Sequence, residues 1–180
     1  MADDSAGPPG KAVSARAIMT FYVIALLVLA VDQLTKSAAV HLGVEGEQVR
    51  LLGPVVSFSL RHNTGAAWGL FGSGGQWLTY LTTAMVIGLF IAGLEAPLMA
   101  PYLRRALPLL LGGALGNLLD RLRLGAVVDF IDLNVWPVFN VADIAIVASA
   151  VLICYHLLLE GRGAPQLPAA VEEDDECDQS

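Results

Sequence analysis

Residues 18–31 read IMTFYVIALLVLAV, a run without a charged side chain, and they form the densest part of an apolar stretch that covers residues 17–40. About 20 such residues are enough for a helix to cross the ~30 Å hydrocarbon core of a membrane. Three more apolar stretches cover residues 77–100, 107–128 and 139–159. Because backbone groups in lipid must bond within their own segment, the sequence predicts an all-α integral membrane protein with four transmembrane helices.

The composition agrees with a membrane protein of one domain. The chain has 180 residues, of which 56% are hydrophobic, and it has 18 glycines in addition. Soluble domains average about 45–50% apolar residues with glycine included. The net charge of −7 comes mostly from residues 160–180, which hold seven acidic residues and one arginine. We therefore expect cytoplasmic tails at residues 1–16 and 161–180, the second acidic and disordered, around a membrane domain at residues 17–160.

The start of the chain has an alternative interpretation. Lys11 and Arg16 precede a short apolar run, as they would in a cleaved secretory signal. The chain continues in a helical pattern through residues 31–36 without a convincing cleavage site, which favours a retained helix.

A few functions find no support in the sequence. Cys154 lies in an apolar run and Cys177 in the acidic tail, so we expect no disulfide. The three histidines lack metal-ligand spacing, and no basic stripe indicates nucleic-acid binding. We expect no metal and no cofactor.

The segment between the first two apolar stretches has the pattern of a strand. Over residues 56–61, three apolar side chains alternate with Ser57, Ser59 and Arg61. This period of two predicts a strand with one apolar face. We expect a small β-rich segment outside the membrane within about residues 44–75.

Polar residues gather toward one end of the predicted helices. They are Asp32 and Lys36 in the first stretch, Asn117, Asp120 and Arg121 in the third, Asp129 at or just past its end, and Asn140 and Asp143 at the start of the fourth. Charges at membrane depth are costly and usually mark function.

The orientation in the membrane follows from the distribution of lysine and arginine, whose count ties at five on each side. The count becomes five against two, with both termini cytoplasmic, once three bases are assigned to helix ends or a site.

Two of these acids suggest a catalytic pair. Asp129 has apolar neighbours, and Asp143 shares a helix face with Asn140 three residues before it. Two carboxylates held close together share a proton, so one can activate water while the other polarises a carbonyl. Each acid also has a simpler explanation, as a helix-end acid in water for Asp129 and as an early-turn acid for Asp143. For Asp120 and Arg121 we expect mainly a neutralising ion pair.

The motifs together resemble lipoprotein signal peptidase (signal peptidase II), a family of bacterial membrane aspartic proteases. Five segments occur in the family's order: Asp32-Gln33-Leu34-Thr35-Lys36, Asn63-Thr64-Gly65-Ala66-Ala67-Trp68, Gly116-Asn117-Leu118-Leu119-Asp120-Arg121, Val128-Asp129-Phe130 and Phe139-Asn140-Val141-Ala142-Asp143. They cover most of residues 18–159.

The resemblance implies a fold and an activity. The family has four membrane helices, cytoplasmic termini and a β-rich cradle after the first helix. It implies Asp129 and Asp143 as the catalytic pair, with Asn63, Asn117, Arg121 and Asn140 lining the site, Asp32 and Lys36 supporting the fold and pocket, and Asp120 bracing Arg121. The substrate would be a bacterial prolipoprotein that carries diacylglycerol on a cysteine and is cleaved just before it, at the outer face of the inner membrane. Membrane lipids surround the protein, and a monomer holds all the parts.

Two other functions stay open at this point. Buried aspartates also serve proton-coupled transporters or channel subunits, although 180 residues show no internal repeat. An assembly factor could use the glycine-rich third stretch to pack against a partner, but it would leave Asp129 and Asp143 without a purpose.

Overall fold

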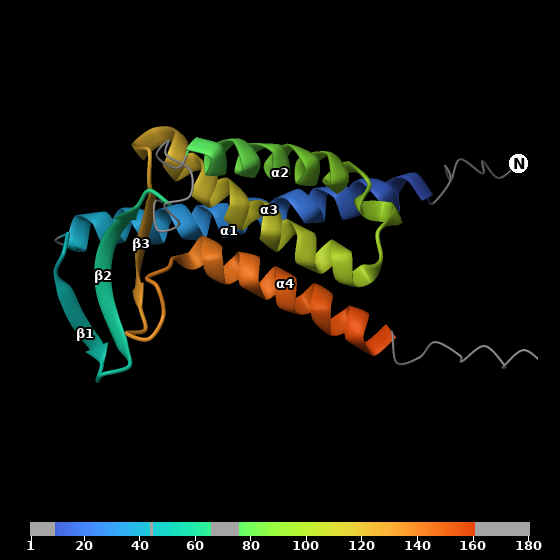
Figure 1. Cartoon of the computed structure of the whole chain (residues 1–180). Helices are drawn as coiled ribbons and strands as arrows, with labels where there is room; N and C mark the ends of the chain where they lie inside the picture. The colour runs from blue at the N-terminus through green and yellow to red at the C-terminus, as the bar shows by residue number, and fades with distance from the viewer. Residues whose placement is uncertain (1–9, 44, 66–75, 161–180) are drawn as a thin grey trace, which may run out of the picture.

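The computed structural model describes residues 10–43, 45–65 and 76–160. Four long helices lie side by side, and a small sheet covers one end of them (Figure 1). The helices are α1 (Gly10–Leu42), α2 (Gln76–Leu94), α3 (Pro101–Leu124) and α4 (Val141–Glu160), with a 3-10 turn η2 (Ala96–Leu98) between α2 and α3. The strands are β1 (Gln48–Leu52), β2 (Val56–Asn63) and β3 (Val127–Asp132).

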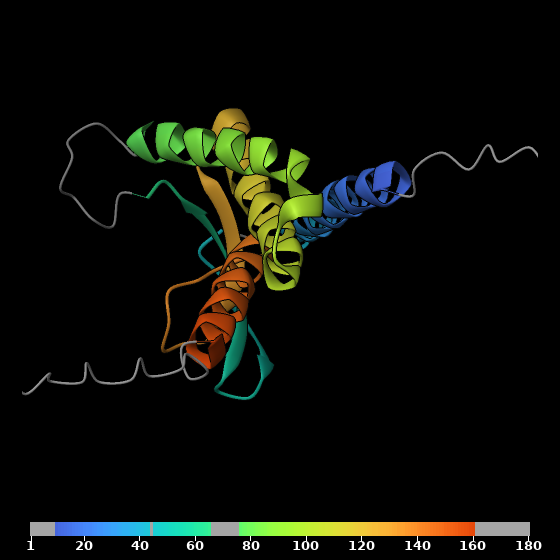
Figure 2. The ribbon, with the colours of Figure 1, turned by 90° about the vertical axis from the view of Figure 1, so that its right-hand side faces the viewer.

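Three of the four helices have the character of membrane spans. Among the described residues, Ala15–Leu42, Gln76–Leu94 and Val141–Leu159 are long and apolar enough to cross a membrane. The expected fourth span, α3, falls short because charged and polar side chains lie toward both of its ends: Arg104, Arg105, Asn117, Asp120, Arg121 and Arg123. In the fold α3 packs against α1, α2 and α4 (Figure 2). Its glycines and the polar Asn117 and Asp120 are buried.

The boundaries of the third stretch were predicted wrongly. We expected a helix over residues 107–128, but α3 begins at Pro101 and ends at Leu124. Gly125 ends it with a left-handed backbone (φ 74°), a conformation that glycine adopts without steric cost, and its N–H bonds to the Arg121 carbonyl. The β-branched residues that follow form β3, so Asp129 lies on a strand rather than at a helix end.

The sheet confirms the predicted strand and adds a partner from later in the chain. Its order is β1-β2-β3, and both pairings are antiparallel. Phe58 and Leu60 pack with Ala39 of α1 and Val128 of β3. Ser57 and Ser59, which alternate with the apolar side chains of β2, are also buried. The sheet is thus bound to the end of α1, and β3 extends it beyond residues 44–75.

Glycines on α3 let its neighbours approach closely. A Cβ on Gly112 would lie 2.5 Å from the Ala25 carbonyl oxygen of α1, and one on Gly113 would lie 2.6 Å from the Ala142 carbonyl oxygen of α4. A Cβ on Gly116 would collide with the carboxylate of Asp32. Because these glycines have no side chain, α1 and α4 can pack closely against α3, next to the buried carboxylate of Asp32.

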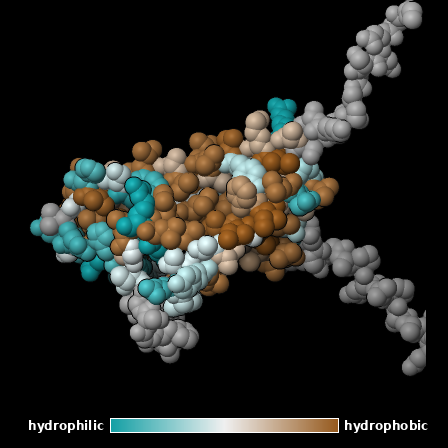
Figure 3. Space-filling view, turned by 90° about the horizontal axis from the view of Figure 1, so that it is seen from above, coloured by the Kyte–Doolittle hydropathy of each residue, from teal (hydrophilic) through white to brown (hydrophobic). Residues whose placement is uncertain are grey.

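The outer surface of the helices is apolar. Side chains such as Leu26, Leu34, Phe90 and Val147 are about half exposed or more. Figure 3 shows the resulting brown surface over the helices and hydrophilic residues toward the sheet end. Exposed leucine and valine on this scale suit a lipid environment.

We predict that Gly116→Ala destabilises the protein by about 1–3 kcal/mol, because the added methyl must displace the Asp32 carboxylate from its buried partners. Gly88→Ala on α2 is the matched control, since nothing lies within 4 Å of a Cβ there. Thermal unfolding in detergent measures both variants. Equal stability of the two would contradict the close contact at Gly116.

Candidate active site

A buried cluster of three charges lies where α1 and α3 meet. The Lys36 ammonium is 2.9 Å from a carboxylate oxygen of Asp32 and 2.8 Å from one of Asp120. All three side chains are at most 5% exposed. Buried charges are tolerated only when paired and hydrogen-bonded, so each of these groups depends on the others.

Gln33 completes the cluster, and the sequence analysis did not select it. Its amide group donates to the carboxylates of Asp120 (3.0 Å) and Asp32 (3.2 Å) and to the Gly116 carbonyl (3.3 Å). Its position in the motif between Asp32 and Lys36 could have indicated this role, because a polar side chain in an apolar helix needs hydrogen-bond partners.

The two carboxylates of the cluster also accept hydrogen bonds from backbone N–H groups of two other segments. Asp32 accepts a hydrogen bond of 2.9 Å from the N–H of Ala142, in the first turn of α4. Asp120 accepts one of 3.1 Å from the N–H of Val128, the residue before Asp129. One carboxylate therefore fixes the start of α4, and the other fixes β3.

Asn117 carries the contact from the cluster to Asp143. Its side-chain oxygen accepts a 3.0 Å hydrogen bond from Lys36, which leaves its NH₂ group to donate to Asp143 at 2.8 Å. An ammonium can only donate, so the orientation of the Asn117 amide is determined by Lys36.

Asp143 belongs to a reciprocal cap at the start of α4. The Asn140 side-chain oxygen accepts from the Asp143 N–H (3.0 Å), and the Asp143 carboxylate accepts from the Asn140 N–H (3.2 Å). This is the capping-box arrangement, with an aspartate in place of the usual glutamate. It holds the Asp143 carboxylate at the positive end of the helix dipole.

Asp129 is buried on β3 and is held from two sides. The Asn140 NH₂ group donates to one of its oxygens at 2.7 Å, and the Asn63 NH₂ group donates to the other at 3.0 Å. Asn63 lies on β2, and its own side-chain oxygen accepts from the Gly65 N–H. The side chain of Asn140 therefore bonds to Asp129 while its backbone N–H bonds to Asp143.

The electrostatics favour a retained proton. Asp129 lies on β3, outside the membrane-crossing helices, and burial raises its pKa from 3.8 to about 6. The charge of Asp143 adds to this rise, whereas hydrogen bonds from Asn63 and Asn140 and the charge of Lys36 oppose it. Because the folded state holds this proton more tightly than the unfolded chain, the Asp129 carboxyl contributes stability below about pH 4. That contribution declines as the pH rises through about 6.

The expected ion pair between Asp120 and Arg121 was wrong. Adjacent residues on a helix point in different directions, and Asp120 pairs with Lys36 instead. The Arg121 guanidinium lies half-buried, bonds to the Asn117 carbonyl at 3.5 Å, and is within electrostatic range of Asp143, Asp129 and Asp120. Its electrostatic partners thus include the two site carboxylates besides Asp120, whose ion pair is with Lys36.

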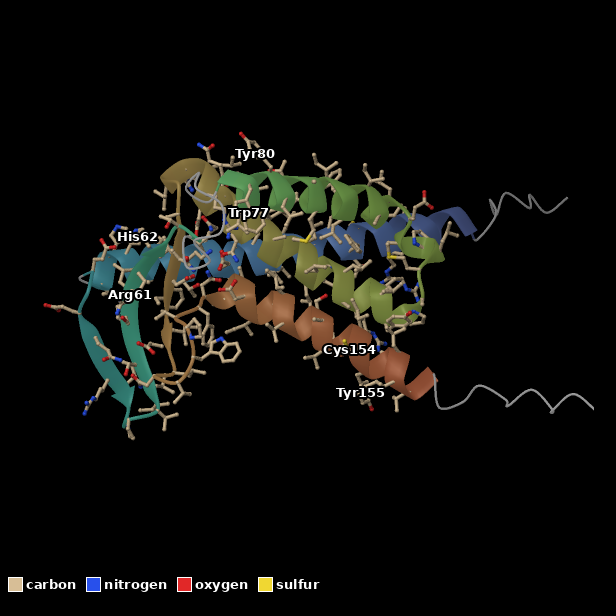
Figure 4. All side chains as sticks on the ribbon, viewed as in Figure 1. Arg61, His62, Trp77, Tyr80, Cys154 and Tyr155 are labelled. Atoms are coloured by element: carbon tan, nitrogen blue, oxygen red, sulfur yellow. The ribbon has the colours of Figure 1, made fainter. Side chains whose placement is uncertain are left out.

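Among the other residues, Arg61 is the cross-strand partner of Asp129, and its side chain is exposed. Figure 4 shows His62 and Arg61 on β2, and Cys154 toward the far end of α4. Cys154 is a free thiol, and Cys177 lies outside the described residues. Within the described ranges, no group of three or more His, Cys, Asp and Glu side chains is arranged to hold a metal ion.

The chain is similar to known proteins over most of its length. A family model described as signal peptidase (SPase) II matches residues 24–159. The lipoprotein signal peptidase of Moorella thermoacetica is 45% identical over 141 residues, which cover 78% of this chain and 94% of that protein. That of Mycobacterium tuberculosis (strain H37Rv) is 39% identical over 156 residues, covering 82% and 75%.

Solved structures agree with this similarity. One structure of a bacterial membrane enzyme superposes with a TM-score of 0.70 at 31% sequence identity, covering 77% of this chain and 92% of that chain. A second also has a TM-score of 0.70, at 29% identity, covering 82% and 93%.

We predict that Lys36→Met destabilises the protein by about 3–5 kcal/mol, because two buried carboxylates lose their cation. Glu45→Gln is the control, since the ion pair of Glu45 with His62 is exposed and worth less than about 1 kcal/mol. Unfolding in detergent compares the two variants. A small loss in Lys36→Met would show that the cluster does not hold the fold.

We predict opposite pKa changes at Asp129 in two variants. Asp143→Asn removes a negative charge and lowers the pKa below the wild-type value of about 6, whereas Asn63→Leu removes a hydrogen bond to the carboxylate and raises it. Carbon-13 NMR of labelled aspartate in micelles measures both changes. Shifts in the same direction would contradict the described surroundings of Asp129.

Proposed function

The chain belongs to the signal peptidase II family, and we propose that it cleaves lipid-modified prolipoproteins with Asp129 and Asp143 as an aspartic catalytic pair. The observation that carries this proposal is that Asn140 bonds to both carboxylates, at 2.7 Å and 3.2 Å. Two acids attached to one small residue are near enough to influence each other's protonation.

The proposed reaction needs one shared proton and one water. The ionised carboxylate removes a proton from water, and the resulting hydroxide attacks the carbonyl carbon of the scissile peptide bond. The protonated carboxyl donates a hydrogen bond to the carbonyl oxygen, and the leaving amine takes up a proton as the bond breaks. The raised pKa of Asp129, about 6, suits it to hold the shared proton.

Two further groups would act on the substrate. The half-buried Arg121 guanidinium lies near both carboxylates and can stabilise the negative charge that develops on the carbonyl oxygen. The exposed Asn63 can place the substrate backbone beside Asp129, to which it donates. We assign both residues to substrate binding, and Asp32, Lys36, Asp120, Asn117 and Asn140 to positioning.

An apolar groove next to Asp143 supports a lipid-bearing substrate. The groove has a volume of about 410 Å³ and lies between the loop after β3 and α4, lined by Leu133, Trp136, Phe139, Ile144, Val147 and Ala148 besides Asp143 itself. An amide bond presented from lipid would reach the acids along this surface. We propose that the substrate carries diacylglycerol on a cysteine and is cleaved immediately before it.

The membrane arrangement is part of the same proposal. We propose that α3 crosses the membrane as a fourth helix, shielded from lipid by α1, α2 and α4, so that both termini lie in the cytoplasm of a bacterium. The sheet and the two acids then lie at the outer face of the inner membrane. A proton-coupled transporter is less well supported, because the polar network stays at one end of the helices.

We predict that Asp129→Asn and Asp143→Asn each lower the cleavage rate at least 100-fold, because either change removes one partner of the acid–base pair. A gel assay with a diacylglyceryl-modified prolipoprotein measures the rate. Asp132→Asn is the matched control on the same strand, where the carboxylate bonds to Gln48 and the Asn134 N–H, and its rate should stay within about threefold of wild type.

The variants must also remain folded in the membrane. Equal helix content and equal unfolding temperature show this for each protein. Cleavage near the wild-type rate in either Asp129→Asn or Asp143→Asn would contradict the proposed catalytic pair. An equal loss of cleavage rate in Asp132→Asn would indicate a general effect on the sheet.

A further inference from the structure

A second pocket lies at the opposite end of the helices from the two acids. It has a volume of about 360 Å³ and lies between the start of α1 and the start of α3, where its lining includes Arg16, Thr20, Phe21, Pro101, Arg104 and Arg105. In Figure 1 this is the end of the bundle away from the sheet. The proposed peptidase reaction does not use any of these residues.

Three arginines from two helices line this pocket. Arg16, Arg104 and Arg105 are exposed, and none of them forms an ion pair with another described residue. In the described part of the chain, the lining contains no carboxylate. As far as the described residues go, the pocket therefore carries three positive charges and no negative one.

The start of α3 adds to this positive potential. Ala100 is the N-cap residue, and it cannot offer a side-chain oxygen to the first N–H groups of the helix. Pro101, the first helical residue, lines the pocket. The positive end of the helix dipole thus lies beside the three arginines, which favours an anion at this position.

The floor of the pocket is apolar and continues into the membrane-facing surface. Phe21 is buried, Ile24 also lines the pocket, and Leu27, three residues further along the same helix face, is 60% exposed. The run of α1 without charged side chains begins just after Arg16. Basic residues at the ends of membrane helices lie near the level of lipid headgroups.

We propose that this pocket binds the phosphate of an anionic glycerophospholipid, with one acyl chain along Ile24 and Leu27 of α1. Arginine matches a phosphate with paired N–H groups, and the apolar floor matches the chain that a lipid carries and a free phosphate lacks. Such a lipid bridges α1 and α3 at the end opposite the buried charge cluster and ties the two helices together there.

The test is direct lipid binding by the full chain in neutral detergent. Native mass spectrometry with added dioleoylphosphatidylglycerol gives the dissociation constant, independently of peptidase activity. Each of Arg16→Gln, Arg104→Gln and Arg105→Gln should weaken binding about fivefold, and the triple variant on the order of 100-fold. Arg123→Gln, an exposed arginine at the other end of α3, should change it less than twofold.

Further arms separate a lipid site from a general effect of charge. Dioleoylphosphatidylcholine and 10 mM glycerol 3-phosphate should not displace the bound lipid, because the first lacks net charge and the second lacks acyl chains. Wild-type affinity in the triple variant, an equal loss in Arg123→Gln, or displacement by glycerol 3-phosphate would each overturn the proposal. If the triple variant does not fold, the lipid affinities of the three single variants test the proposal, and wild-type affinity in all three would overturn it.

Discussion

The site depends on the ion pairing of the buried Lys36 ammonium with two carboxylates. The ammonium lies between the carboxylates of Asp32 and Asp120, 2.9 Å and 2.8 Å away. A buried carboxylate without a cation costs several kcal/mol, so neither acid is tolerated there without Lys36. Because Asp32 also bonds to the backbone of α4 and Asp120 to that of β3, the same cation sets where Asp129 and Asp143 lie.

This arrangement explains why the central helix is the least apolar of the four. α3 supplies Asn117 and Asp120 to the network, and its glycines admit α1 and α4 closely enough for the hydrogen bonds to form. Both of these polar side chains are buried by neighbouring elements of the protein. The apolar surface that faces outward belongs largely to α1, α2 and α4, so the bundle separates a membrane-facing shell from a polar interior at one end.

The sequence predicted the helices well and the junctions poorly. Long apolar runs located all four helices, and the alternation over residues 56–61 located the strand β2. The third strand was missed because Val127–Asp132 is as apolar as a helix end, and only the left-handed Gly125 separates the two. The motifs named the residues that meet in the site, but adjacency along the chain suggested Arg121 as the partner of Asp120. The contacts of Gln33 and Lys36 with Asp120 could be seen only once α1 was placed beside α3.

The most direct test of this account is amide hydrogen exchange in Lys36→Met. We predict that the Val128 and Ala142 amides both exchange at least 100-fold faster than in wild type, because the carboxylates that accept from them lose the cation that holds them. The amide of Val86 in α2 should gain less in exchange rate than these two, because no carboxylate of the cluster accepts from it. Unchanged exchange at both Val128 and Ala142, or faster exchange at only one of them, would contradict the claim that a single buried cation positions β3 and α4 together.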